Sequence, residues 1–76
     1  MNWQERIVVD PDVLAGKPLV RGTRISVEYV LDAMADGATE DELLAGHPRL
    51  TRADVLACVA YAADVIRSER VLPLTA

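Results

Sequence analysis

The residues best suited to chemistry lie in one short stretch, Gly16-Lys17-Pro18-Leu19-Val20-Arg21-Gly22-Thr23-Arg24. Gly16 and Gly22 permit positive φ angles, while Pro18 fixes its own φ and favours an extended residue before it. The sequence therefore predicts an ordered turn, which sets the direction of the side chains that it carries. An arginine presents a planar fork of donors suited to carboxylate or phosphate. The candidate partner-binding residues are Lys17, Arg21, Thr23 and Arg24.

Two interpretations of Arg21 and Arg24 remain open at this point. In the first, each pairs with an acidic residue of the same chain, such as Asp32 or Asp36, and fastens the turn to the rest of the domain. Surface ion pairs of this kind are common and contribute little stability. In the second, at least one of the two arginines enters an anionic site on a partner.

A second basic group, Arg49, Thr51 and Arg52, flanks the expected start of the longest helix. A helix N-terminus favours phosphate, so these are candidate DNA-binding residues. Two features oppose this interpretation. The connection over residues 46–50 exceeds the turn of about three to four residues found in helix-turn-helix motifs. The preceding segment also carries Glu40, Asp41 and Glu42, which repel a phosphate backbone.

No arrangement of side chains indicates catalysis or a metal site. His47 has no Ser, Cys or carboxylate at a recognisable spacing, and we expect its ring to pack at a helix junction. Cys58 is the only cysteine and lies among small apolar residues, so one Cys and one His provide neither a disulfide nor a zinc site. We expect a binding protein without cofactors, not an enzyme.

Charge is unevenly distributed along the chain. The net charge is −4, and the segment from Glu28 to Pro48 holds six acidic residues and no Lys or Arg. Non-specific binding to nucleic acid draws on phosphate neutralisation by basic residues, so the overall charge argues against it. Any anionic partner should meet the flanking segments, which hold all eight basic residues.

The N-terminal part predicts a small β element over residues 1–25. Residues 6–10 are β-branched and end at Asp10-Pro11, and residues 19–20 and 24–25 are candidates to pair with them. A two-stranded piece is marginal alone, so it must pack on the helices that follow.

Three helices are predicted over residues 26–70. Ser26 caps the first, which ends at Gly37; Thr39 and Glu42 form a capping box for a second helix of about two turns that ends at Gly46 and Pro48. Thr51 with Asp54 repeats the capping signal for a long helix from Arg52 to about Arg70. The apolar tail over residues 71–76 should pack on something. The expected fold is mainly α: a short N-terminal hairpin followed by a three-helix bundle.

The apolar face of the long helix is too broad for one small core. Its stripe consists of Val55, Leu56, Val59, Ala62, Ala63 and Ile66, and Cys58, Tyr61 and Val65 extend it along one side. One interpretation is a slightly larger core, in which Cys58 is simply a small buried hydrophobe. The other is a homodimer interface formed by Cys58, Tyr61, Ala62 and Val65.

With 76 residues the chain forms one domain, whose small core favours oligomerisation. The longest apolar run, residues 55–63, is far shorter than the ~20 residues of a membrane span. The N-terminal residues lack the apolar stretch of a secretory signal. We expect a cytoplasmic protein with no membrane association.

The stretch from Gly16 to Arg24 resembles the signature of domain-of-unknown-function family 433, which reads Gly-Lys-Pro, two aliphatic residues, then Arg-Gly-Thr-Arg. Further similarities are Val27, Gly37, His47-Pro48 and Leu50-Thr51. The resemblance covers the chain from Arg6 to about Arg67.

Members of that family resemble antitoxins, often encoded beside a PIN-like ribonuclease, with a helical part similar to homeodomain-like domains. The resemblance implies a homeodomain-like, helix-turn-helix-like bundle that neutralises such a ribonuclease toxin, with autoregulation at operator DNA as a second role. We expect the mechanism to be occlusion, in which Lys17, Arg21 and Arg24 reach the acidic site of the nuclease while the apolar tail and the long helix add contact area. The alternatives are a DNA-binding regulator without a toxin and a purely structural interaction module.

Overall fold

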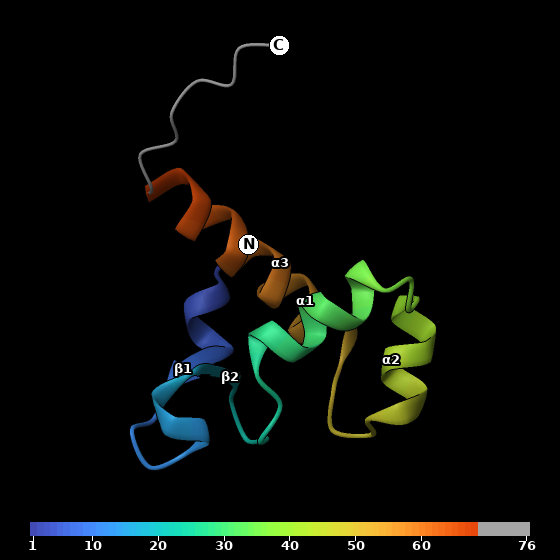
Figure 1. Cartoon of the computed structure of the whole chain (residues 1–76), viewed down its shortest axis with the longest axis horizontal. Coiled ribbons are helices and arrows are strands. Elements are labelled where there is room, and N and C mark those ends of the chain that lie inside the picture. The colour runs from blue at the N-terminus through green and yellow to red at the C-terminus, as the bar shows by residue number, and fades with distance from the viewer. Residues whose placement is uncertain (69–76) are drawn as a thin grey trace, which may run out of the picture.

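The computed structural model describes residues 1–68, which form a two-stranded antiparallel sheet followed by three helices (Figure 1). The elements are a 3₁₀ turn (Trp3–Glu5), β1 (Ile7–Val9), a second 3₁₀ turn (Leu14–Gly16), β2 (Pro18–Val20), α1 (Val27–Ala35), α2 (Glu40–Gly46) and α3 (Arg52–Ser68). The predicted hairpin followed by three helices is confirmed. The predicted end of the long helix and the tail over residues 71–76 lie outside the described residues.

Strands β1 and β2 pair with Ile7 opposite Val20 and Val9 opposite Pro18. The prediction that residues 19–20 pair with β1 is therefore confirmed. Residues 24–25 do not pair with β1, because the chain turns back along β2, where the backbone N–H of Val20 donates to the carbonyl of Ile25 at 2.9 Å. The chain after β2 thus forms a turn that carries Arg21 and Arg24 and bonds back to β2.

Each helix begins at a side-chain cap that the sequence predicts. The Ser26 hydroxyl accepts a backbone N–H at the start of α1, and Thr39 with Glu42 forms a complete capping box at α2. At α3 the two bonds of a capping box are also present: Thr51 N–H donates to Asp54 Oδ2 at 3.0 Å, and Asp54 N–H donates to Thr51 Oγ1 at 3.2 Å. These caps fix where α1, α2 and α3 begin.

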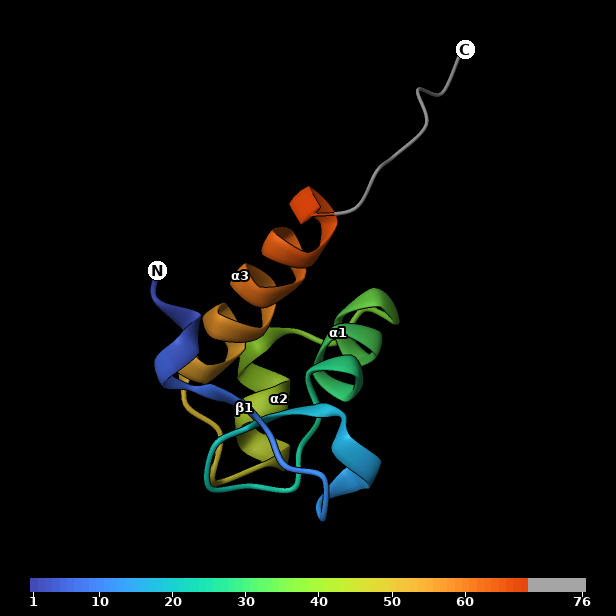
Figure 2. The same ribbon diagram turned by 90° about the vertical axis from the view of Figure 1, so that its left-hand side faces the viewer.

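The core lies between the hairpin and the inner faces of the three helices (Figure 2). Its buried members are Ile7, Val20, Val27, Val30, Leu43, Leu50, Val55, Ala57 and Cys58. Leu19 is buried as well, at 4% exposure. Among the described residues, no helix has the length and apolarity needed to cross a membrane.

The predicted apolar stripe of α3 does not describe its buried face. The buried residues of this helix are Asp54, Val55, Ala57 and Cys58, whereas Leu56 and Val59 are 45% and 42% exposed. The reason is Asp54, whose carboxylate bonds to Arg6 and to the backbone of Thr51 and so turns toward the hairpin. This bonding sets the rotation of α3 and leaves part of its apolar surface facing outward.

The N-terminus is attached to the middle of α3 through Trp3. Its indole ring packs edge-on against Tyr61, with ring centroids 4.9 Å apart, and its Nε1–H donates to the Asp64 carboxylate. Trp3 therefore anchors the first turn of the chain to α3, a role that its sequence context left undetermined.

Candidate functional site

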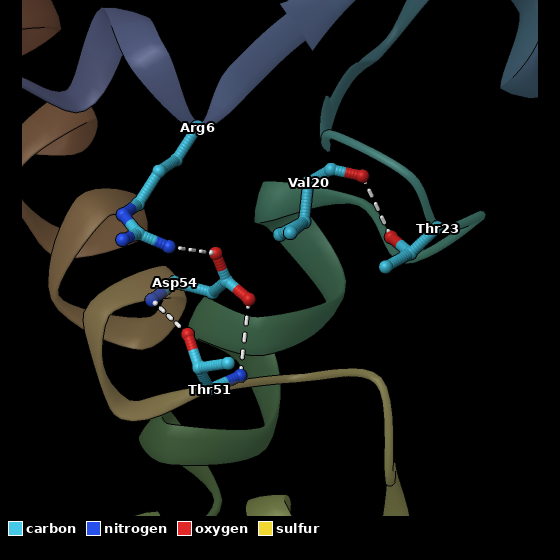
Figure 3. A network of polar contacts seen from close by, with 5 residues as sticks. All are labelled: Arg6, Val20, Thr23, Thr51 and Asp54. Atoms are coloured by element: carbon cyan, nitrogen blue, oxygen red, sulfur yellow. Dashed lines mark hydrogen bonds and ion pairs between the residues drawn. The ribbon is translucent and has the colours of Figure 1, made fainter.

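The turn over residues 21–25 is held by backbone and side-chain hydrogen bonds. Thr23 Oγ1 donates to the carbonyl of Val20 at 2.7 Å (Figure 3). The same oxygen accepts the Ile25 N–H at 3.0 Å, and the Arg21 N–H donates to the carbonyl of Arg6 at 2.8 Å. Gly22 has a φ of 78°, in the left-handed region that favours glycine. The predicted ordered turn is confirmed for residues 21–25, whereas Pro18–Val20 of the same stretch form strand β2. The turn holds Thr23 half-buried, with its hydroxyl engaged within the turn.

Arg21 and Arg24 extend from this turn into solvent. Within residues 1–68, neither makes an ion pair with Asp32, Asp36 or any other carboxylate. The interpretation in which helix-one carboxylates fasten these arginines is therefore wrong for the described part of the chain. Asp32 and Asp36 are exposed on α1 and its C-terminal cap.

Lys17 lies apart from the two arginines. Its ammonium is 3.7 Å from the Glu28 carboxylate, and both side chains are more than half exposed. Lys17 lines a groove between α1 and α3, whereas Arg24 lines a different groove beside the α2–α3 connection. The predicted set of Lys17, Arg21 and Arg24 thus divides into a paired lysine and two unpaired arginines.

The α2–α3 connection joins the turn to form one surface. Arg49 Nη1 donates to the carbonyl of Gly22 at 3.3 Å, across 27 residues of sequence. A groove of about 720 Å³ runs between these segments, lined by Val13, residues 22–25 and residues 46–49. The sequence places Arg24 in the candidate partner-binding group and Arg49 in the candidate DNA-binding group. Nothing in their spacing along the chain indicates that the two residues meet.

His47 closes one side of this surface. Its Nε2 is 2.9 Å from the Tyr29 hydroxyl, and the two rings meet edge-on with centroids 5.2 Å apart. The expectation that His47 packs at a helix junction is confirmed. A smaller adjoining groove shares Arg24, Ile25 and His47 with the first, so the surface continues toward the start of α1.

The remaining residues predicted for DNA binding have partners within the chain. Arg52 Nε lies 3.4 Å from the Glu40 carboxylate, and the hydroxyl and backbone of Thr51 form the cap of α3. Acidic residues fill the first turn of α2 beside them. Of the three, Arg49 alone contributes to the surface around the turn, among the residues the structure describes.

A buried carboxylate ties the hairpin to α3 behind the turn. Arg6 Nη1 donates to Asp54 Oδ1 at 3.1 Å, and the other Asp54 oxygen accepts the Thr51 N–H (Figure 3). The Asp54 side chain is 10% exposed, so these bonds compensate for burying its charge. Because the Arg6 carbonyl accepts from Arg21, the same network supports the turn from below.

Basic residues divide sharply into paired and unpaired groups. Of the seven in residues 1–68, four make ion pairs with carboxylates: Arg6, Lys17, Arg52 and Arg67. The other three are Arg21, Arg24 and Arg49. All three lie on the turn or donate to it, so the basic residues without an ion pair in the part of the chain that the structure describes gather at one place.

The predicted dimer residues occupy two different environments. Cys58 is fully buried, so it cannot contact a second copy in this fold, and its assignment to an interface is wrong. Burial, with a smaller contribution from the Asp54 charge, raises the pKa of its thiol to about 11. Tyr61, Ala62 and Val65 instead line the groove of about 360 Å³ between α1 and α3.

Within the described range, no three His, Cys, Asp or Glu side chains come together as a metal site. The site is therefore described by its hydrogen-bonding and charge alone.

Comparison with known proteins places the same segments in a single family. Residues 7–62, which include the turn and the α2–α3 connection, match the family described as protein of unknown function DUF433. The chain belongs to this family. In this DUF433 chain, the stretch from Gly16 to Arg24 therefore contains a hydrogen-bonded turn that exposes Arg21 and Arg24.

The chain is also similar to two other proteins. An uncharacterized protein, y4eO, of Sinorhizobium fredii is 34% identical over 68 residues, which are 88% of this chain and 31% of that protein. The crystal structure of a DUF433 member from Anabaena variabilis superposes with a TM-score of 0.79 at 34% identity, covering 84% of this chain and 63% of the other. The chain spans less than a third of y4eO and under two thirds of the crystallised relative.

Proposed function

We propose that this chain is a cytoplasmic, antitoxin-like binding protein that neutralises a PIN-like ribonuclease by occluding its acidic site. The proposal rests on one observation: Arg21, Arg24 and Arg49, which make no ion pair within residues 1–68, gather at the hydrogen-bonded turn. The family resemblance of the Gly16–Arg24 stretch to antitoxins supplies the class of partner. The chain acts by binding and performs no catalysis of its own.

The chemistry of an arginine suits the acidic site of a nuclease. A nuclease that uses metal ions gathers carboxylates around them, and a guanidinium can bind two carboxylate oxygens at once. An arginine placed there would occupy the position of the metal and make charge-assisted hydrogen bonds in a site that excludes water. Arg21 and Arg24 are exposed and available for this role.

The turn reduces the entropic cost of that insertion. The bonds made by Thr23 and by the Arg21 N–H fix the backbone before the partner arrives, so little ordering is left for binding. Arg49 and the groove beside it extend the contact surface around the two arginines.

The proposal predicts that a PIN-like nuclease is encoded beside this chain's gene, and the test is inhibition of that nuclease by the chain, measured as the inhibition constant for RNA cleavage. In the Arg21→Ala, Arg24→Ala double variant we expect inhibition to weaken by about 100-fold or more, since losing a desolvated charge pair costs ~2–5 kcal/mol. The matched control is the Arg52→Ala, Arg67→Ala double variant, which removes the same charge from exposed positions. Unchanged inhibition in the first variant would refute the mechanism.

A second candidate, a DNA-binding regulator, draws on the shared surface of Arg24 and Arg49 beside the start of α3. The acidic first turn of α2 and the Arg52–Glu40 pair oppose it. A steep fall in affinity for its own promoter with rising salt, lost in the Arg49→Ala variant, would favour this candidate.

A further inference from the structure

The outward face of α3 carries an unpartnered apolar stripe formed by Leu56, Val59, Ala63 and Ile66, here called the outer α3 face. Leu56, Val59 and Ile66 are 45%, 42% and 62% exposed. The four residues are separated by three, four and three positions, which is the spacing of a helix that packs against another helix.

The residues around the stripe are also apolar, as they are on a helix surface that another protein element covers. The nine residues Val55–Ala63 contain no charged side chain on any side of the helix. A helix on a protein surface ordinarily has a polar outer face, and a helix that is apolar all round is buried all round. One side of α3 packs on the core through Val55, Ala57 and Cys58, whereas the opposite side keeps its apolar residues exposed, as the surface of an interface would.

We propose that this partner is a second copy of the chain, with the two α3 helices packed antiparallel about a twofold axis. The spacing of three, four and three reads the same in both directions. An antiparallel copy therefore places Leu56 opposite Ile66 of the second copy, and Val59 opposite its Ala63. Such a self-complementary surface is what a twofold interface requires.

The flanking positions favour close contact between the helices. Ala53, Ala60 and Ala62 border the stripe, so small side chains allow the two backbones to approach. Ala62 and Ile66 also line the apolar groove between α1 and α3, so the interface continues onto α1 around Leu31. This groove adds area toward what a stable dimer needs, about 1,200–2,000 Å² in total.

The arrangement also determines where the arginine turns lie. Arg49, just before α3, donates to Gly22, so each turn is beside the N-terminal end of its own α3 (Figure 2). Antiparallel helices place the two turns at opposite ends of the pair. The dimer then presents two separate arginine sites, a consequence that holds for any anionic partner and does not depend on the proposed function.

The first test is sedimentation velocity of the full chain at micromolar concentration, with and without Val59→Glu. We expect a dimer for the wild type and a dissociation constant raised about 100-fold or more in the variant, because the interface would bury an unpaired charge. The control is Val9→Glu, an equally drastic change at an exposed β1 position away from α3, which should leave the dimer intact. Leu56→Lys replaces Val59→Glu if circular dichroism shows that the latter is unfolded.

The second test distinguishes the direction of the helices by disulfide cross-linking. A mixture of Val59→Cys and Ala63→Cys chains should cross-link between copies, whereas each variant alone should not. Cross-linking of each variant alone would indicate parallel helices and overturn the arrangement. A monomeric wild type would overturn the dimer itself. If Val59→Glu then also weakened nuclease binding, the outer α3 face would be assigned to the nuclease and not to a second copy.

Discussion

The arginines of residues 1–68 fall into two groups. Those that pair with carboxylates stabilise the fold, and those that do not are available to bind a partner. Arg6 illustrates the first kind, because its bond to buried Asp54 joins the hairpin to α3. Arg24 illustrates the second kind, because it lies exposed on an ordered turn without an ion pair in the described residues. An exposed charge on a preformed backbone loses little conformational freedom when it binds, which is a property of a binding residue.

Asp64 contributes to stability in a pH-dependent way. The hydrogen bond from the Trp3 indole, and then the Arg67 guanidinium, hold the pKa of this carboxyl below its ordinary value of 3.8. A lowered pKa in the folded state means that the unfolded chain takes up the proton first. The stabilisation is therefore present above the ordinary pKa and is lost as the pH falls through the folded value.

We predict that the free energy of unfolding falls as the pH drops below about 4, with a change in Trp3 fluorescence over the same range. Because Trp3 is the only tryptophan, the signal reports this contact directly. Asp64→Asn should remove the fluorescence change, whereas Asp12→Asn, an exposed control, should keep it. A titration unchanged by Asp64→Asn would show that the Trp3 contact does not govern it.

At the scale of elements, the sequence predicts what local bonds decide. Ser26, Thr39 and Thr51 begin their helices as expected, because a cap depends on residues within one turn. The rotation of α3 could not be predicted, since it depends on Asp54 meeting Arg6 from 48 residues away. The apolar periodicity of the helix predicts that Asp54 lies on the surface. In the structure, Asp54 is instead buried and paired with Arg6.

The candidate site likewise has parts that the local sequence predicts and parts that depend on contacts between distant segments. The ordered turn was predictable from its glycines and proline, and the exposure of Arg21 and Arg24 was one of two interpretations left open. The contact between Arg49 and Gly22 was not predictable, because it joins segments 27 residues apart through a backbone carbonyl. The separation of Lys17 likewise depends on its position opposite Glu28 on α1.

Thr23 provides a test of the turn as an element. Thr23→Val removes both side-chain bonds, to the Val20 carbonyl and from the Ile25 N–H, without changing any charge. We predict a loss of about 1 kcal/mol in unfolding free energy and about tenfold weaker nuclease inhibition, because the arginines must then be ordered on binding. Both quantities are measurable, by urea denaturation and by the RNA cleavage assay.

The control for this prediction is Thr23→Ser, which keeps the hydroxyl and should behave as the wild type. Should Thr23→Val inhibit as strongly as the wild type, preorganisation of the turn would contribute nothing to binding.

For the whole molecule, the fold concentrates positive charge at one end of an acidic protein. The hairpin carries the turn to the α2–α3 connection, so Arg24 and Arg49 meet beside one groove, while α1 and α2 together hold five acidic residues and no basic one. Repulsion between this acidic surface and the nuclease's carboxylates would restrict binding to the arginine end. In the proposed complex, we therefore expect the distribution of charge as well as direct contact to set the orientation of the two proteins.

Competition with Mg²⁺ tests the central claim most directly, because arginines that occupy a metal site must exclude the metal. The measurement is the affinity of the full chain for the nuclease at rising Mg²⁺ concentration, with ionic strength held constant by NaCl. We predict that wild-type affinity falls steadily as Mg²⁺ fills the acidic site, and that the weaker affinity of the Arg21→Ala, Arg24→Ala variant does not change. Equal affinity of the wild type with and without Mg²⁺ would contradict the claim.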